Sequence, residues 1–306
     1  MPEQNIQNEV LVNIEGEKKE VWVAKIFAIL SFLIDFCEKN HLRYYVCAGT
    51  ALGAVRHKGI IPWDDDIDIM MPRKDYETLL RKLSSMDDMP YGLAYPTPAN
   101  AYYLRFAKVY DKESTLLELP ELRYVIGPFV DIFPVDGCPN DKTTTERLFK
   151  KYQYYYYYFG ITSIYWRKKD YLDHLHKYLY KRVFVQLLAH GLRRLVRYYT
   201  LKKMKEIESM YDYDKCAKVI TWCGQQTCER EIHNREWMGE GTELPFENLI
   251  VKAPSNYDAY LKCMYGDYMT PPPAEKQTSH HSVAYINLKA RESLKSVRKK
   301  IKEIEK

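Results

Sequence analysis

The chain has 306 residues, of which 46% are hydrophobic and 28% charged, and its formal net charge is +5. This length and composition allow a full hydrophobic core in one or two globular domains. The first 19 residues are polar and acidic and lack a basic segment, which argues against a secretory signal. Seven cysteines without a CxxC pair predict reduced thiols in a cytoplasmic protein.

Apolar residues recur at helical spacing near the start of the chain, which predicts an amphipathic helix over Glu17 to Lys39. Charges at Lys25 and Asp35 interrupt this stretch, so we do not expect it to span a membrane. The further expected elements are a strand over Arg43 to Cys47, a short helix over Thr50 to His57, an acidic strand over Asp66 to Met70, a helix from Pro72 to about Ser85, and strands over Leu104 to Tyr110 and Phe129 to Phe133. This order predicts an α/β (α+β) fold in which a small mixed sheet is flanked by helices.

Four carboxylates fall within five residues of the acidic strand, at Asp64, Asp65, Asp66 and Asp68. Because strand side chains alternate between faces, Asp66 and Asp68 point the same way while isoleucines 67 and 69 point into a core. Two oxygen donors on one rigid strand suit Mg²⁺ or Mn²⁺. A solvated acidic turn is the alternative, although such a turn does not need the alternating isoleucines.

The predicted strand before this cluster leads into Gly49 and Thr50 and then into a helix, which is an arrangement that binds phosphate. Glycine lets the backbone approach an anion, and threonine can cap the helix. Arg56 and His57 add positive or protonatable groups between the two elements. An isolated Gly-Thr pair is a weak signal, and its value comes from its place just before the paired carboxylates.

The stretch CAGTALGAVRHKGIIPWDDDIDIMMPRKDYETLL resembles the signature of the LicD family, which belongs to the nucleotidyltransferase superfamily together with fukutin and fukutin-related protein. In that superfamily a Gly-Ser/Thr turn precedes an acidic-x-acidic strand, and a third carboxylate comes from a later strand. Gly49-Thr50 and Asp66-x-Asp68 match the first two parts. The tail YDAYLKCMYGDYMTPPPAEKQTSHHS also resembles the family's C-terminal signature.

The third carboxylate of the pattern is expected at Asp131, in the strand-like run GPFVDIFPVDG. A buried carboxylate in such a run needs a partner. Asp136 is the rival, but its neighbouring Pro and Gly favour a turn.

The resemblance implies a transferase that moves phosphocholine, or a related alcohol phosphate, from CDP-choline or another CDP-alcohol to a glycan or lipid-linked glycan, with release of CMP. Asp66, Asp68 and Asp131 would hold Mg²⁺ (or Mn²⁺), and Asp131 would also accept the proton of the attacking hydroxyl. The residues expected to bind substrate are Gly49, Thr50, Arg56, His57, Asp64, Asp65, Lys108, His280 and His281. Among these, Lys108 would reach the phosphates, and Asp64 and Asp65 would orient Arg56 or His57 or bind the acceptor sugar.

A basic, tyrosine-rich segment separates the predicted core (residues 1–140) from a C-terminal part (211–306) that completes the site. Between Asp141 and Lys205 the chain has 16 Lys or Arg residues and four Asp or Glu residues, so this segment is far more basic than the rest. Basic residues mixed with Tyr and Trp suit an anionic membrane surface, at the inner face of a membrane for a cytoplasmic protein. A helical cover of the site is the alternative, and nucleic-acid binding is a third option that we do not expect.

Two further functions stay open from the sequence. A nucleotidyltransferase would release pyrophosphate from an NTP, and a non-catalytic membrane-surface or nucleic-acid-binding protein would not need the three carboxylates. Cys223, Cys228 and His233 offer three ligands for a second metal site, a weaker possibility because a fourth is not apparent.

Overall fold

The computed structural model describes residues 14–163, 191–224, 226–277 and 283–304. Its helices are α1 (Glu17–Lys39), α2 (Ala48–Arg56), α3 (Arg73–Ser84), α4 (Lys142–Ile161), α7 (Arg193–Glu208), α8 (Tyr257–Tyr265) and α9 (Leu294–Ile304), with short 3₁₀ helices at Tyr213–Lys215, Arg235–Trp237 and Ala274–Lys276. Its strands are β1 (Tyr45–Val46), β2 (Asp68–Pro72), β3 (Gly92–Ala94), β4 (Ala107–Tyr110), β5 (Thr115–Leu117), β6 (Phe129–Cys138), β7 (Lys218–Ile220), β8 (Ile232–Asn234), β9 (Thr242–Phe246), β10 (Leu249–Ala253) and β11 (Tyr285–Asn287).

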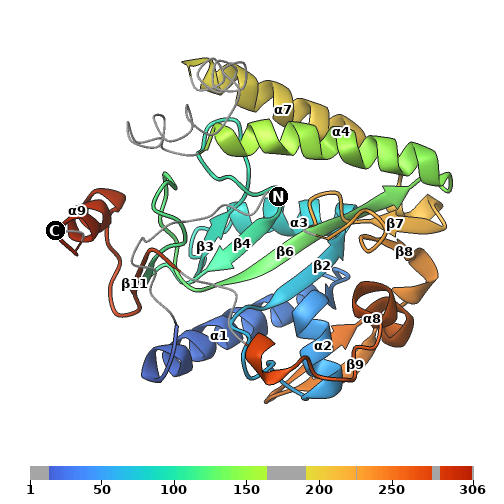
Figure 1. The fold of residues 1–306 in the computed structure, drawn as a ribbon, viewed down its shortest axis with the longest axis horizontal. Coiled ribbons are helices and arrows are strands. Elements are labelled where there is room, and N and C mark those ends of the chain that lie inside the picture. The colour runs from blue at the N-terminus through green and yellow to red at the C-terminus, as the bar shows by residue number, and fades with distance from the viewer. Residues whose placement is uncertain (1–13, 164–190, 225, 278–282, 305–306) are drawn as a thin grey trace.

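The main sheet is mixed and is organised around β6 (Figure 1). Its order is β1-β2-β6-β4-β3, and β7 pairs with the far end of β6 and carries β8 beside it. Strands β2 and β6 are parallel, whereas β1, β4 and β7 join the sheet in antiparallel pairs. The chain therefore has the predicted α+β fold, with a small mixed sheet and flanking helices, and two-stranded sheets β9–β10 and β5–β11 at its side.

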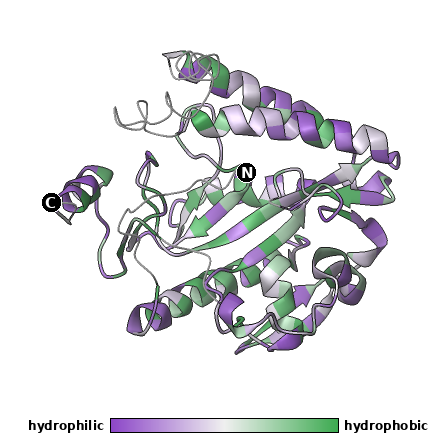
Figure 2. Ribbon diagram, viewed as in Figure 1, coloured by the Kyte–Doolittle hydropathy of each residue, from purple (hydrophilic) through white to green (hydrophobic). Residues whose placement is uncertain are grey.

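The two faces of the sheet carry different side chains because alternate residues point to opposite sides. Ile67, Ile69 and Ile132 are fully buried in the core that α1 and α3 close, as the alternating pattern predicts. The opposite face carries Asp68, Asp131 and their neighbours, and the helix pair α4–α7 lies on this side of the molecule. In Figure 2 the strands of the sheet are largely green, while the outer surfaces of the helices carry purple bands.

Several predicted boundaries differ from the structure. The helix Glu17–Lys39 matches its prediction at both ends, but β2 begins at Asp68, so Asp66 lies in the segment just before the strand. Strand β6 continues to Cys138, so the predicted turn at Asp136 is wrong. The cause is pairing with β7, which aligns Asp136 with Ile220 and keeps the chain extended.

The basic segment is described only in part, because residues 164–190 lie outside the described ranges. Helices α4 and α7 pack along each other at one side of the sheet (Figure 1). Arg197, counted with the surface charges in the sequence, is only 3% exposed. Within the described residues, no helix combines the length and apolar character that a membrane span requires. The predicted domain boundaries stay a prediction, although β7 and β8 bring residues beyond 211 into the same sheet as the core.

Candidate active site

A cross-strand row of charged residues lies at the centre of the main sheet. Asp68 on β2 is the register partner of Asp131 on β6, and Asp131 is in turn the partner of Lys108 on β4. Neighbouring strands lie about 4.8 Å apart, so the three side chains stand side by side on one face. All three are at least nine-tenths buried. The sequence-predicted carboxylates at 68 and 131 are therefore adjacent, and they come from parallel strands.

Lys108 neutralises part of this row. Its Nζ lies 2.9 Å from Asp131 Oδ1 and 3.3 Å from Glu118 Oε1, a residue that the sequence analysis missed. Burial lowers the pKa of Lys108, but Asp131 and Glu118 outweigh burial and raise it above its usual value. The ammonium is thus already paired with two carboxylates, which does not support the predicted direct contact with phosphate.

Asp68 is held in an unfavourable electrostatic environment. Burial raises its pKa well above the usual value, and the negative charges of Asp66, Asp131 and Asp64 raise it further, against a smaller opposing effect of Lys108. A divalent cation among these carboxylates would relieve the repulsion, and carboxylate oxygens are the donors that Mg²⁺ and Mn²⁺ prefer. Asp66, Asp68 and Asp131 offer the right donor atoms for such an ion, but in the described residues their oxygens do not all come within 4.8 Å of one another.

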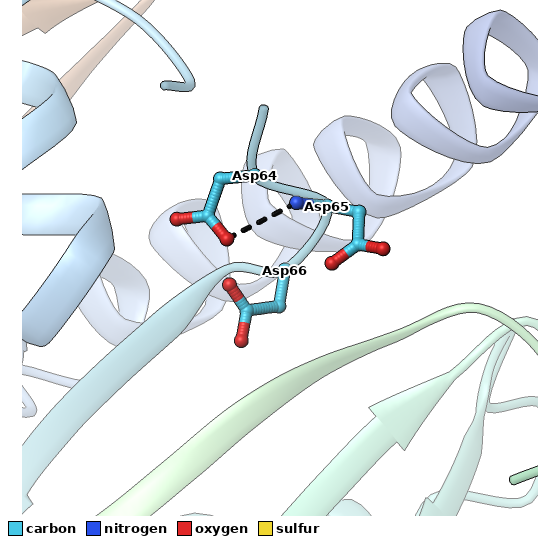
Figure 3. Close-up of side chains that lie close together, drawn as sticks. All are labelled: Asp64, Asp65 and Asp66. Carbon is cyan, nitrogen blue, oxygen red and sulfur yellow. Dashed lines mark hydrogen bonds between the residues drawn. The ribbon is translucent and has the colours of Figure 1, made fainter. Parts of the chain in front are cut away.

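The segment before β2 forms a compact acidic turn, Asp64 to Asp66 (Figure 3). One carboxylate oxygen from each residue lies within 4.8 Å of the others. In Figure 3 the carboxyl groups of Asp64 and Asp66 lie on the same side of the turn, while Asp65 points the other way. Burial raises the pKa of Asp64 to about 7, with Asp66 and Asp65 adding to the effect. In the described part of the chain, Asp64, Asp65 and Asp66 are the group of three whose ligand oxygens lie close together. This group shares only Asp66 with the predicted ligand set.

The start of α2 packs directly against the acidic turn. A Cβ on Gly49 would lie 2.7 Å from Asp64 Oδ2, so any larger residue here would displace the Asp64 carboxylate. Thr50 does not cap the helix, because Cys47 is the N-cap residue. Instead the Thr50 hydroxyl accepts a hydrogen bond of 2.8 Å from the backbone N–H of Asp68 and fixes the first residue of β2. Gly49 and Thr50 therefore position the carboxylates, in addition to any phosphate contact.

Arg56 and His57 lie at the other end of α2. The Arg56 guanidinium donates to His57 Nε2 at 3.0 Å and to the Tyr268 carbonyl at 2.8 Å. The hydrogen-bond partners of Arg56 are thus His57 and Tyr268, and the predicted orienting role of Asp64 and Asp65 stays a prediction. Burial lowers the pKa of His57, and Arg56 adds to the effect. His280 and His281 lie outside the described residues.

The C-terminal signature reaches the site through α8. The Tyr260 hydroxyl accepts a hydrogen bond from the backbone N–H of Ala48, the first residue of α2. Tyr265 lies close enough to Asp68, Asp64 and Asp66 that their charges, after burial, raise the pKa of its phenol. Tyr265 has no local sequence signal, because only the packing of α8 on α2 brings it to the carboxylates.

The second possible metal site does not form. Cys223, Cys228 and His233 do not bring their ligand atoms together, since in the described ranges the acidic turn is the group of three that can hold an ion. All seven cysteines are free thiols, in agreement with the prediction.

A parallel carboxylate pair on a mixed sheet, with a Gly-Thr helix start packed against the neighbouring acidic turn, defines a nucleotidyltransferase-like protein. Residues 41–186 match the family model described as LicD/FKTN/FKRP, nucleotidyltransferase domain. The chain is 26% identical over 261 residues to the lipopolysaccharide cholinephosphotransferase LicD of Haemophilus influenzae, a match that covers 84% of this chain and 94% of that protein. Residues 41–186 thus carry a LicD-family nucleotidyltransferase domain, and the protein is an enzyme, a phosphotransferase of the LicD type.

Shorter similarities link the chain to two uncharacterized rickettsial proteins. A protein of Rickettsia prowazekii is 35% identical over 87 residues, which cover 28% of this chain and 31% of that protein. A protein of Rickettsia typhi is 41% identical over 60 residues, which cover 20% of this chain and 18% of that protein. The family resemblance seen in the motifs is thus confirmed by the family model and by the LicD relative.

Proposed function

We propose that the chain transfers phosphocholine, or a related alcohol phosphate, from a CDP-alcohol to a hydroxyl of a cell-surface glycan or lipid-linked precursor and releases CMP. The LicD relative, a lipopolysaccharide cholinephosphotransferase that the chain matches over nearly its whole length, supports the transferred group and the acceptor class. In the proposed reaction the acceptor oxygen forms a bond to the phosphocholine phosphorus, the bond from that phosphorus to the bridging oxygen breaks, and CMP leaves.

The observation that carries the proposal is the adjacency of Asp68 and Asp131 on parallel strands, with Asp66 just before β2. These carboxylates would hold Mg²⁺ (or Mn²⁺), which supplies charge neutralisation at the diphosphate when bound. Asp131 is proposed to accept the proton of the acceptor hydroxyl. The first turn of α2 contributes backbone N–H groups that favour an anion beside the carboxylates.

The test is incubation of the purified protein with Mg²⁺ and a panel of CDP-choline, CDP-ethanolamine, CDP-ribitol and NTPs, with and without glycan acceptors. We expect CMP from a CDP-alcohol, and its loss with chelator or in Asp68→Asn. Asp87→Asn changes an exposed aspartate away from the site and serves as the matched control. Pyrophosphate from an NTP would favour a nucleotidyltransferase instead, and no turnover with any donor would reject both.

We also propose that the exposed face of α4 and α7 contacts an anionic membrane surface, which would bring the site to a lipid-carried acceptor. Tyr154, Leu195 and Tyr198 are more than half exposed on these helices, next to the exposed charges of Arg194 and Lys202. Aromatic, apolar and basic side chains together suit the headgroup zone. Sedimentation with vesicles rich in phosphatidylglycerol, but not with phosphatidylcholine vesicles, is expected, and Arg194→Glu with Lys202→Glu should abolish it.

A further inference from the structure

The chain enters α2 through a strained residue, Ala48. Its φ is 45°, a left-handed conformation that a residue with a Cβ rarely adopts. The preceding N-cap residue, Cys47, is extended, so the change of direction between β1 and α2 falls on Ala48. A residue other than glycine keeps such a conformation where the surrounding structure holds it, and residues of this kind cluster at functional sites. Specific contacts must therefore hold this turn.

The residues on either side of Ala48 are held by β2. The backbone N–H of Cys47 donates a hydrogen bond of 3.1 Å to the carbonyl of Asp68, and the backbone N–H of Asp68 donates to the Thr50 hydroxyl at 2.8 Å. Neither bond involves Ala48. The N–H of Ala48 donates instead to the hydroxyl of Tyr260 on α8, at 3.1 Å and across 212 positions of sequence. A distant helix thus supplies the hydrogen bond of the strained residue.

Tyr260 is itself fixed by its surroundings. It is only 3% exposed, and its ring centroid lies 4.7 Å from that of His233, which also packs against Trp237. Burial raises the pKa of the Tyr260 phenol well above its usual value and lowers the pKa of His233 to about 4, so both rings are uncharged at neutral pH. A buried pair of neutral rings is a rigid support, so the hydroxyl is in place before any substrate binds.

The conformation of Ala48 determines where the next two backbone N–H groups lie. Those of Gly49 and Thr50 belong to the first turn of α2, where a helix offers no acceptor of its own, and neither has a hydrogen-bond partner among the described residues. Gly49 borders the acidic turn, since a Cβ there would come within 2.7 Å of Asp64 Oδ2. N–H groups at the start of a helix favour an anion. In the proposed function this anion is the diphosphate of the donor.

We propose that Tyr260 is a positioning residue, whose hydroxyl holds Ala48 in its left-handed conformation and so presets the first turn of α2 for the donor diphosphate. The inference rests on the proposed function and adds a residue to it. Tyr260 acts through Ala48 and does not have to touch the substrate. Because glycine adopts a positive φ at no steric cost, the hydroxyl should matter while residue 48 carries a Cβ and should lose most of its importance when residue 48 is glycine.

The first test measures the KM values for CDP-choline and for the acceptor in Tyr260→Phe, by CMP release with Mg²⁺. The variant keeps the ring that packs on His233 and loses one hydrogen bond, so we expect the KM for CDP-choline to rise roughly tenfold while the KM for the acceptor stays within about twofold. The matched control is Tyr285→Phe, which loses a phenol hydrogen bond of 2.5 Å to Glu292 in β11, away from α2 (Figure 1). Its KM for CDP-choline should stay within about twofold of the wild type. Thermal unfolding verifies that each variant is folded.

The second test is a double-mutant cycle. Ala48→Gly alone should leave the KM for CDP-choline within about threefold of the wild type. In the Ala48→Gly background, Tyr260→Phe should raise this KM by less than about threefold, instead of the roughly tenfold rise expected when residue 48 is alanine. A loss of packing around Tyr260 would have the same effect in both backgrounds, so this non-additivity distinguishes the positioning role from a structural one.

Three results would overturn the proposal. In Tyr260→Phe, an unchanged KM for CDP-choline would mean that the hydroxyl does not preset the turn, and an equal rise in both KM values would mean a general disturbance of the site. An equal rise of the donor KM in both backgrounds would mean that the hydroxyl does not act through Ala48.

A further readout does not depend on turnover. If the wild type turns over no CDP-alcohol, the proposed function fails, and hydrogen exchange still decides whether Tyr260 positions the turn. The amide of Ala51 donates to the Cys47 carbonyl at 3.1 Å and closes the first turn of α2. Its exchange should be faster in Tyr260→Phe than in the wild type and unchanged in Tyr285→Phe. Unchanged exchange in Tyr260→Phe would reject the inference.

Discussion

The contrast between Asp131 and Asp136 provides the sharpest experiment on this chain. The two residues lie five positions apart on β6 and are both buried, so sequence alone left them as rivals. Their partners differ. Asp136 accepts two hydrogen bonds of 2.7 Å from Arg73, and it belongs to a buried network in which Arg73 and Arg105 face Asp136 and Glu208. Asp131 instead shares Lys108 with Glu118.

Charge balance predicts opposite consequences for the two asparagine variants. In Asp136→Asn two arginines face one carboxylate, and removing one partner of a buried pair costs about 3–5 kcal/mol. For a chain of this length about 1.5 °C in Tm corresponds to 1 kcal/mol, so the expected fall is about 5–8 °C. In Asp131→Asn, Lys108 keeps Glu118 and the repulsion with Asp68 is removed, so we expect a change within about 1 kcal/mol.

The assays are thermal unfolding and CMP release, measured on both variants. Asp131→Asn should lose catalysis while it keeps its Tm, and Asp136→Asn should lose stability while it retains much of its activity below its Tm. If Asp136→Asn is as stable as the wild type and inactive, then the third carboxylate of the site has been assigned to the wrong residue. A large fall in Tm for Asp131→Asn would refute the charge-balance reasoning.

Three further predictions concern the site and the core. Gly49→Ala places a Cβ 2.7 Å from Asp64 Oδ2 and should cut CMP release at least about tenfold. The control is Gly160→Ala in α4, whose Cβ meets nothing within 4 Å; it should leave stability unchanged or raise it by up to about 1 kcal/mol. Equal CMP release by the two variants would contradict the prediction. Burial lowers the pKa of His233 to about 4 in the folded protein, whereas a histidine in the unfolded chain has a pKa of about 6.5. As the pH falls below 6.5 the unfolded chain therefore binds a proton before the folded protein does, and about 3 kcal/mol of folding free energy should be lost by pH 4. Denaturant unfolding should show that His233→Leu lacks this loss. Burial raises the pKa of Glu231 to about 7, so Glu231 makes folding stability rise as the pH falls, but this effect is the same in the wild type and in the variant. Mg²⁺ should raise the Tm of the wild type, with no such shift in Asp68→Asn, and an equal shift in both would place the ion elsewhere.

Local sequence patterns correctly predicted the helices and strands whose structure depends on their own residues. Helix α1 begins and ends where the apolar period does, at Glu17 and Lys39, and the alternating isoleucines correctly place Asp68 on the face opposite the core. Asp68 and Asp131, which the family resemblance assigns to one site, are register partners on β2 and β6. In these cases the periodic pattern of buried residues extends over only a few neighbouring positions, so it can be seen directly in the sequence.

The features that the sequence did not predict depend on contacts between distant segments. The extension of β6 through Asp136 depends on β7, which lies some eighty positions later, and no local signal marks that pairing. Glu118 and Tyr265 reach the site only through strand register and the packing of α8. Lys108 was expected to reach the phosphates, but in the structure it is the counter-ion of Asp131 and Glu118 on the neighbouring segments. Tertiary contacts determine the roles of such residues, and those contacts cannot be read from the local sequence.

The hydrogen bond from Ala48 to the Tyr260 hydroxyl has a consequence for how the enzyme matures. A ribosome releases residue 48 more than two hundred residues before residue 260, so the helix that borders the acidic turn waits for its partner until synthesis is almost finished. Polypeptides that stop before α8 therefore lack the hydrogen bond that anchors the first residue of α2.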